Sequence, residues 1–169
     1  MSFLNTRLVL IMLRFIHVVS GVLWAGGAVL LATFVLPAAR DEANTRYLRR
    51  LIWTRNLPRY LNVTLVLALL SGLTMYGNLT IVTQGAWARS HAGMAFGVGG
   101  ALSIIAAVIA SFVAAPAIHR ALELANKQPS SAEISVESTR SLARYGAAMR
   151  LVAVLLTGTA ALMAVARYL

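Results

Sequence analysis

The sequence predicts an all-α, polytopic membrane protein: a bundle of four transmembrane helices forming a single membrane domain over residues 1–169. Of its 169 residues, 59% are hydrophobic and 12% are charged, which is more apolar surface than a soluble domain can bury. Four apolar runs reach the roughly 20 residues that a membrane helix needs. The basic residues lie almost entirely between these runs, so the net charge of +10 indicates membrane topology and not nucleic-acid binding.

The four expected spans cover residues 8–36, 60–80, 91–118 and 147–168. Pro58 precedes the second run, and Pro37 and Pro116 close the first and third, because proline cannot continue the helical hydrogen-bond ladder. Ser130 and Glu133 form a plausible capping box, so the fourth helix is expected to begin before the membrane. The ends "FVLPAAR" and "FVAAPAIHR" are alike, which hints at a duplicated two-helix hairpin.

Orientation follows from the distribution of arginine and lysine. The segments at residues 37–59 and 119–146 carry ten basic residues, whereas the opposite side has only Arg7, Arg89 and Arg167, with Arg14 just inside the first span. Both long segments are therefore predicted to be cytoplasmic and both termini periplasmic.

Small and polar residues recur at helical spacing on each span and predict its inward face, because small residues let membrane helices approach closely. The predicted faces are Arg14, His17, Ser20, Gly21, Trp24, Gly27, Ala28 on the first span; Thr64, Ala68, Ser71, Met75, Asn78 on the second; Gly93, Gly97, Gly100, Ser103 on the third; and Gly146, Arg150, Ala153, Thr157, Ala160, Ala164, Arg167 on the fourth.

His17 lies on the inward face of the first span, and an imidazole there needs a partner. All five acidic residues fall on the predicted cytoplasmic side, so Arg14, one turn outward from His17, has no carboxylate nearby. A haem b with His17 as an iron ligand, and with its propionates toward Arg14 and Arg89 or Arg167, would satisfy both side chains. In the alternative interpretation, Arg14 reaches lipid phosphates and His17 hydrogen-bonds a carbonyl on a neighbouring helix.

His91, at the start of the third span, is the best candidate for a second metal ligand, although it lies off the glycine-lined face of its helix. Copper is a weaker alternative to haem, based on Met12, Met75, Met94 and Met163, since thioethers suit Cu(I). The absence of cysteine excludes disulfides and thiolate metal sites.

The stretch "HVVSGVLWAGGAVLLATFVLPAAR" resembles the first span of CopD-like and HemJ-like small integral membrane proteins. "RNLPRYLNVTLVLALLSGLTMYG" and "WARSHAGMAFGVGGALSIIAAVIASFVAAPAIHR" are similar to the second and third spans. The resemblance implies a helical bundle in a bacterial inner membrane, with haem b or copper chemistry and with the family's first-span histidine at His17. HemJ-like members have a histidine and a lysine after the tryptophan; here Arg89 and His91 stand in that window without a lysine, which argues against protoporphyrinogen oxidation.

These observations predict an inner-membrane haem b protein for electron transfer or redox chemistry near the periplasmic face, in contact with the lipid bilayer. The alternatives are copper handling and a non-catalytic accessory subunit of a larger complex, for which "YLRRLIWTRNL" at residues 47–57 offers a docking surface. Besides lipid, other membrane subunits or further copies of the same chain are the candidate partners.

Overall fold

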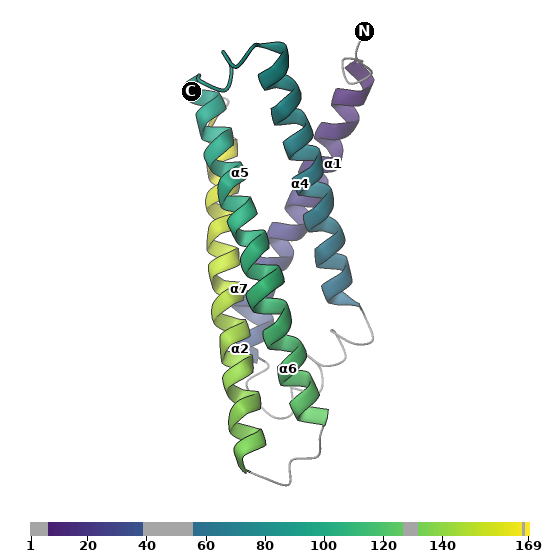
Figure 1. The fold of residues 1–169 in the computed structure, drawn as a ribbon, viewed down its shortest axis with the longest axis vertical. Helices are drawn as coiled ribbons and strands as arrows, with labels where there is room; N and C mark the ends of the chain where they lie inside the picture. The colour runs from purple at the N-terminus through teal and green to yellow at the C-terminus, as the bar shows by residue number, and fades with distance from the viewer. Residues whose placement is uncertain (1–6, 39–55, 127–131, 167) are drawn as a thin grey trace. The chain divides into compact units, whose positions relative to one another are not determined.

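A computed structural model describes residues 7–38, 56–126, 132–166 and 168–169 of the chain. The regular elements in these ranges are all helical (Figure 1): α1 (Arg7–Leu30), η2 (Leu31–Val35), α2 (Leu36–Ala38), α4 (Leu57–Val82), α5 (His91–Ile109), η3 (Ala110–Ala114), α6 (Ala115–Asn126) and α7 (Ala132–Ala166). Within the described ranges, four stretches are long and apolar enough to cross a membrane: Arg7–Ala38, Leu57–Val82, His91–Leu124 and Val136–Ala166. The predicted all-helical membrane fold with four spans is therefore confirmed.

The first and third spans do not end at their prolines. Pro37 and Pro116 each follow a short π-helical segment, η2 or η3, by two residues. Proline lacks an N–H and its ring crowds the carbonyl four residues earlier. The π segments shift the bonding by one residue, so that the N–H of Leu36 bonds the carbonyl of Leu31 and that of Ala115 bonds Ala110.

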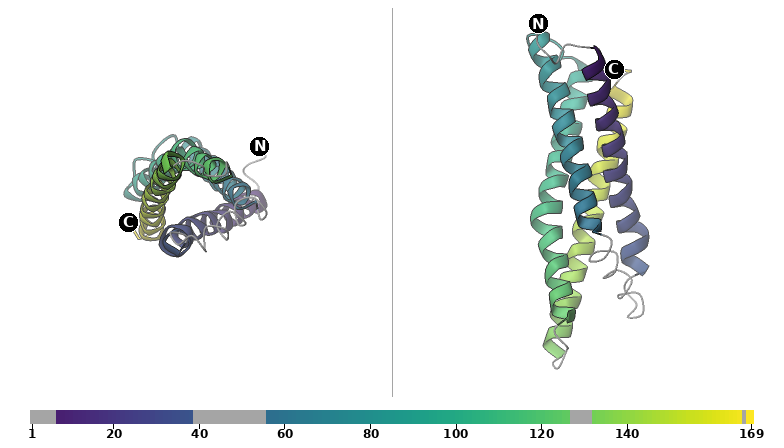
Figure 2. Two further views of the ribbon diagram at one scale, coloured as in Figure 1. Left: turned by 90° about the horizontal axis from the view of Figure 1, so that it is seen from below. Right: turned by 90° about the vertical axis from the view of Figure 1, so that its right-hand side faces the viewer.

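Because the π segments accommodate the prolines, the helix of the third span continues through α6 to Asn126. The predicted end at residue 118 is therefore wrong. Figure 2 shows the first span, coloured purple to blue, continuing through η2 in the same way. The likeness between "FVLPAAR" and "FVAAPAIHR" thus has a structural counterpart, since both stretches carry a π segment at the same distance from the proline.

The fourth helix begins at Ala132, well before the predicted span, which confirms the expected early start. Ser130 of the predicted capping box and the docking segment at residues 47–55 lie outside the described residues.

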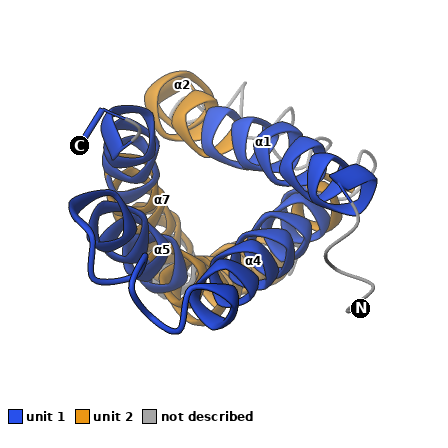
Figure 3. Cartoon of the chain, turned by 90° about the horizontal axis from the view of Figure 1, so that it is seen from above, with its two compact units in different colours: residues 1–26, 61–105, 155–169 blue, residues 27–60, 106–154 orange. Residues whose placement is uncertain are grey.

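The chain divides into two compact units (Figure 3). Unit 1 comprises residues 1–26, 61–105 and 155–169, and unit 2 comprises residues 27–60 and 106–154. The interior of unit 2 consists of apolar side chains from the first, third and fourth spans, among them Leu31, Leu36, Ile118, Leu122, Tyr145, Met149 and the fully buried Val152. Ser138 on α7 donates a hydrogen bond to the Ala121 carbonyl on α6 at 3.2 Å, and exposed Arg120 and Glu137 form an ion pair beside it.

In unit 1, α5 and α7 meet through buried hydroxyl groups. Thr159 on α7 donates to the Gly99 carbonyl at 3.1 Å, and Ser103 donates to the same carbonyl at 3.1 Å. A Cβ added at Gly99 would come within 3.4 Å of the Met163 side chain, so the two helices approach closely here.

The predicted inward faces of the first three spans agree with the buried residues Ser20, Trp24, Ala28, Thr64, Ala68, Ser71 and Ser103. The exception is Arg14, which was predicted on the inward face of the first span but is exposed. The predicted face of the fourth span is wrong except at Ala153, which is buried, because Arg150, Thr157, Ala160 and Ala164 are exposed. The buried face of α7 instead follows Tyr145, Met149, Val152, Leu156 and Thr159. Large apolar side chains of α7 therefore point to the interior, and α7 is turned about its axis relative to the prediction. The hydrogen bond from Thr159 to the Gly99 carbonyl agrees with this orientation.

Candidate functional site

The imidazole of His17 on α1 is held by a backbone carbonyl of α4. Its Nδ1 lies 2.9 Å from the carbonyl oxygen of Ala68 and 3.5 Å from Oγ of Ser71. A carbonyl oxygen only accepts hydrogen bonds, so Nδ1 carries the proton and donates it to Ala68. With the proton on Nδ1, the lone pair of the neutral imidazole is on Nε2.

Gly72 provides the space in which the His17 ring sits. A Cβ added at Gly72 would lie 2.7 Å from Cε1 of His17 and 3.0 Å from Nδ1. Since real Cβ atoms do not make such contacts, any larger residue at position 72 would displace the ring. Ala68, Ser71 and Gly72 therefore position the imidazole together, from one turn of α4.

Nε2 of His17 is left without a hydrogen-bond partner in the described part of the chain. The nitrogen also keeps some accessible surface, since no fully buried side-chain nitrogen or oxygen there lacks a partner. Histidines that bind metal ions commonly donate one ring N–H to a carbonyl and present the other nitrogen to the metal. The arrangement of His17 meets this requirement for one ligand.

The predicted second ligand is not brought to His17. His91 is the first residue of α5, its side chain is exposed, and it makes no hydrogen bond or ion pair with any residue that the structure describes. Ser90 caps this helix by accepting a hydrogen bond from the Gly93 N–H at 3.1 Å. Gly93 is buried two residues after His91, in keeping with the position of His91 off the glycine-lined face.

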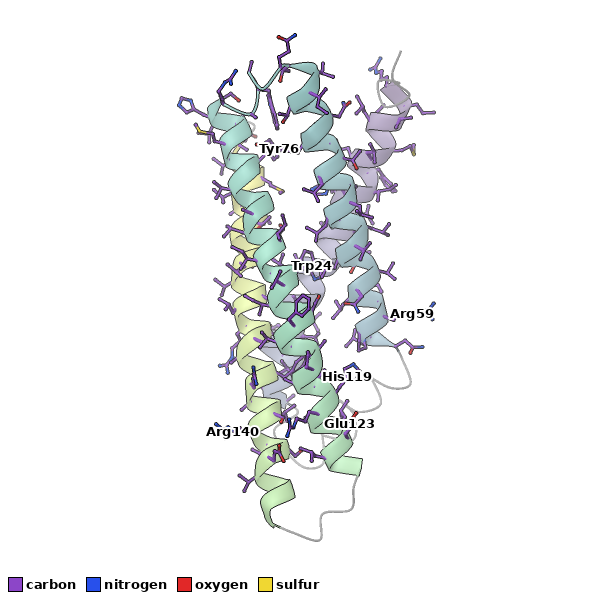
Figure 4. The ribbon with its side chains drawn as sticks, in the orientation of Figure 1. Trp24, Arg59, Tyr76, His119, Glu123 and Arg140 are labelled. Carbon is purple, nitrogen blue, oxygen red and sulfur yellow. The ribbon has the colours of Figure 1, made fainter. Side chains whose placement is uncertain are left out.

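The turn before α5 is packed by aromatic side chains. The rings of Tyr76 and Trp87 lie 5.3 Å apart edge to face, and Trp87 stacks on Phe96 at 6.0 Å. Figure 4 shows Tyr76 near the end of α4 that leads into this turn. Arg89, predicted to contact a cofactor, is exposed and folds over the turn, with its guanidinium 3.7 Å from a Cβ built at Gly85.

Arg14, the other predicted cofactor contact, lines an open groove of about 320 Å³ between α1 and α4. The other lining residues are Arg7, Leu10, Ile11, Met75, Asn78 and Leu79. His17 does not line this groove. Arg14 thus lies one turn from His17 on α1, as predicted, but it lines a groove to which His17 does not contribute.

The four methionines considered for copper do not gather around a histidine. Met75 lines the groove, Met163 contacts Gly99, and Met12 and Met94 are half exposed on separate helices. Across the described ranges, no three histidine or acidic side chains cluster in a way that would hold a metal ion.

Sequence reasoning placed His17 and its inward-facing neighbours Ala68 and Ser71 correctly but missed the role of Gly72. The signal was present, because Gly72 follows Ser71 in the "SG" pair of the second span and small residues permit close helix approach. The sequence does not show which side chain occupies the space beside Gly72, because that depends on how α1 packs against α4.

Comparison with known proteins identified no matching protein family, no matching curated protein and no matching solved structure.

Proposed function

We propose that this protein is an integral membrane haem b-binding protein that serves electron transfer, in which Nε2 of His17 would bind the haem iron. The observation that supports the proposal most is that Nε2 of His17 has no hydrogen-bond partner in the described part of the chain, while Nδ1 forms the bond to the Ala68 carbonyl that the alternative interpretation also predicts. That bond fixes the ring in the tautomer that can ligate a metal and makes the ligand more basic. The glycine at position 72 keeps the ring in place.

A bound haem b would supply a one-electron redox couple, and the residues around His17 would orient its ligand. The exposed position of His91 favours a site with a single protein ligand. The proposal does not depend on the predicted contacts of Arg14 and Arg89 with haem propionates.

The proposal includes a location in a bacterial inner membrane with both termini in the periplasm. It draws on the excess of basic residues in the segments at residues 37–59 and 119–146 and on the resemblance to CopD-like and HemJ-like proteins.

An optical spectrum of the protein, purified in detergent from cells supplied with haem precursor, tests the proposal. We expect a Soret band in the unmodified protein and its loss in His17→Ala. His91→Ala and His119→Ala serve as matched controls, since they remove the chain's other two histidines, both exposed. We expect both controls to keep the band, and we expect the reduced protein to bind carbon monoxide at the open coordination position.

Gly72→Ala sharpens the test, because it leaves His17 in place but puts a methyl group 2.7 Å from Cε1. We expect a weakened or shifted Soret band, whereas Gly77→Ala, where an added Cβ meets nothing within 4 Å, should leave the band unchanged. A colourless protein, or a band that survives His17→Ala, would overturn the proposal. Co-purification of a colourless protein with other membrane subunits would favour the accessory-subunit alternative, and bound copper would favour copper handling.

A further inference from the structure

The groove between α1 and α4 combines cationic and apolar walls. Arg7 and Arg14 stand on one face of α1, seven residues or about 10.5 Å of helical rise apart, and Asn78 faces the same groove from α4. Leu10, Ile11, Met75 and Leu79 complete the lining. The residues lie in two helices that are long and apolar enough to span a membrane, toward the N-terminal end of α1 and the C-terminal end of α4.

The polar groups of this groove have no partner within the described ranges. Arg7, Arg14 and Asn78 form no hydrogen bond or ion pair with any residue there. Unit 1 contains no aspartate or glutamate, so no acidic side chain of the unit can neutralise its guanidinium groups. We therefore expect an anion from outside the protein to pair with the two arginines.

We propose that the groove binds one anionic phospholipid, with its phosphate held by Arg7, Arg14 and Asn78 and its glycerol and upper acyl chain against Leu10, Ile11 and Leu79. Arginine is suited to phosphate because its planar fork donates two parallel hydrogen bonds. Side chains on a helix lean toward its N-terminus, so both arginines extend toward the end of α1 where headgroups lie.

The apolar lining favours a lipid over a free anion, since inorganic phosphate would leave the leucine and isoleucine side chains without a contact. The two uncompensated charges favour a headgroup with net negative charge, such as phosphatidylglycerol, over a zwitterionic one. The inference is independent of haem binding, because His17 does not line the groove.

Native mass spectrometry of delipidated protein, titrated with phosphatidylglycerol or with phosphatidylcholine of the same acyl chains, tests the proposal. We expect one tightly bound lipid with about tenfold preference for phosphatidylglycerol, since each arginine near the headgroups contributes severalfold. In Arg7→Gln/Arg14→Gln the preference should fall to about twofold or less. The control Arg144→Gln/Arg150→Gln removes the same charge from exposed positions in unit 2 and should keep the preference.

Leu79→Trp provides a second variant, because it fills the groove without changing the charge and should also weaken lipid retention. Excess inorganic phosphate should not displace the lipid. Equal retention of both lipids by the unmodified protein, displacement by phosphate alone, unchanged preference in Arg7→Gln/Arg14→Gln, or unchanged retention in Leu79→Trp would overturn the proposal. The Soret band should persist in Arg7→Gln/Arg14→Gln, and lipid preference should persist in His17→Ala, so the failure of one proposal is distinguishable from that of the other.

Discussion

Units 1 and 2 hold their helices together with different chemistry. All five buried polar residues in the described part of the chain, Ser20, Thr64, Ser71, Ser103 and Thr159, belong to unit 1. Unit 1 also contains five glycines at which an added Cβ would meet another residue, at positions 72, 85, 93, 97 and 99. The buried residues of unit 2 are apolar except for the hydroxyl of Tyr145, and its contacts are made by larger side chains such as Leu31, Met149 and Val152.

The difference reflects two ways of associating helices in a bilayer. Lipid tails are as apolar as leucine, so helices gain little from hiding apolar surface and depend on close packing and interhelical hydrogen bonds. Unit 1 achieves close approach through glycine and fixes it with hydroxyl and imidazole bonds to carbonyls. Unit 2 relies mainly on interlocking apolar side chains, with one partly buried hydrogen bond between helices, from Ser138 to the Ala121 carbonyl. The candidate site lies in unit 1, where the position of each side chain is most constrained.

The largest effect should come from Gly93→Ala at the start of α5. An added Cβ would lie 2.0 Å from the backbone oxygen of Trp87, which cannot move without undoing the turn between α4 and α5. We expect the free energy of unfolding to fall by more than about 4 kcal/mol, as measured by denaturation in mixed detergent micelles.

Gly146→Ala in unit 2 is the matched control, because an added Cβ there meets nothing within 4 Å. It should be neutral or raise stability by about 0.5–1 kcal/mol, since alanine is the better helix former. If Gly93→Ala and Gly146→Ala changed the free energy of unfolding equally, the two units would not differ in their dependence on glycine.

A smaller effect separates the interiors of the two units. Val152→Ala in unit 2 removes two methyl groups from a side chain with 0% exposure, and we expect a loss of about 2 kcal/mol. Thr159→Val in unit 1 keeps the volume but removes the bond to the Gly99 carbonyl, for which about 1 kcal/mol is expected. The same detergent titration, applied to both variants, measures the two losses. A cost for Thr159→Val below about 0.2 kcal/mol would show that hydrogen bonds do not stabilise unit 1.

The four spans were predictable because composition and length alone identify membrane helices, and the small-residue pattern located the inward faces of three of them. The pattern failed on α7, where the alanines at 160 and 164 are exposed and Leu156 and Val152 are buried. In a membrane helix both faces are apolar, so hydrophobic periodicity carries little information, and small residues mark an interface only when a neighbour is present.

The course of the helix beyond Pro116 was not predictable from local rules. Proline normally ends a helix, but the π segment at Ala110–Ala114 allows the helix to continue past Pro116 to Asn126. For the candidate site, periodicity placed His17, Ala68 and Ser71 on inward faces. The bond from His17 to Ala68, the space at Gly72 and the groove at Arg14 depend on the register of α1 against α4, which sequence spacing within one helix does not contain.

The smallest effect concerns the link between α6 and α7 in unit 2. Arg120 and Glu137 form an ion pair, but their side chains are 66% and 46% exposed, so water screens the attraction. We expect Glu137→Gln to cost at most about 0.5 kcal/mol, and less in high salt. Ser138→Ala removes the partly buried hydrogen bond to the Ala121 carbonyl and should cost about 1 kcal/mol, independent of salt. If Glu137→Gln lowered the free energy of unfolding by more than this, and the loss depended on salt, the ion pair would stabilise the contact between α6 and α7. The stability of unit 2 could then not be attributed to apolar packing.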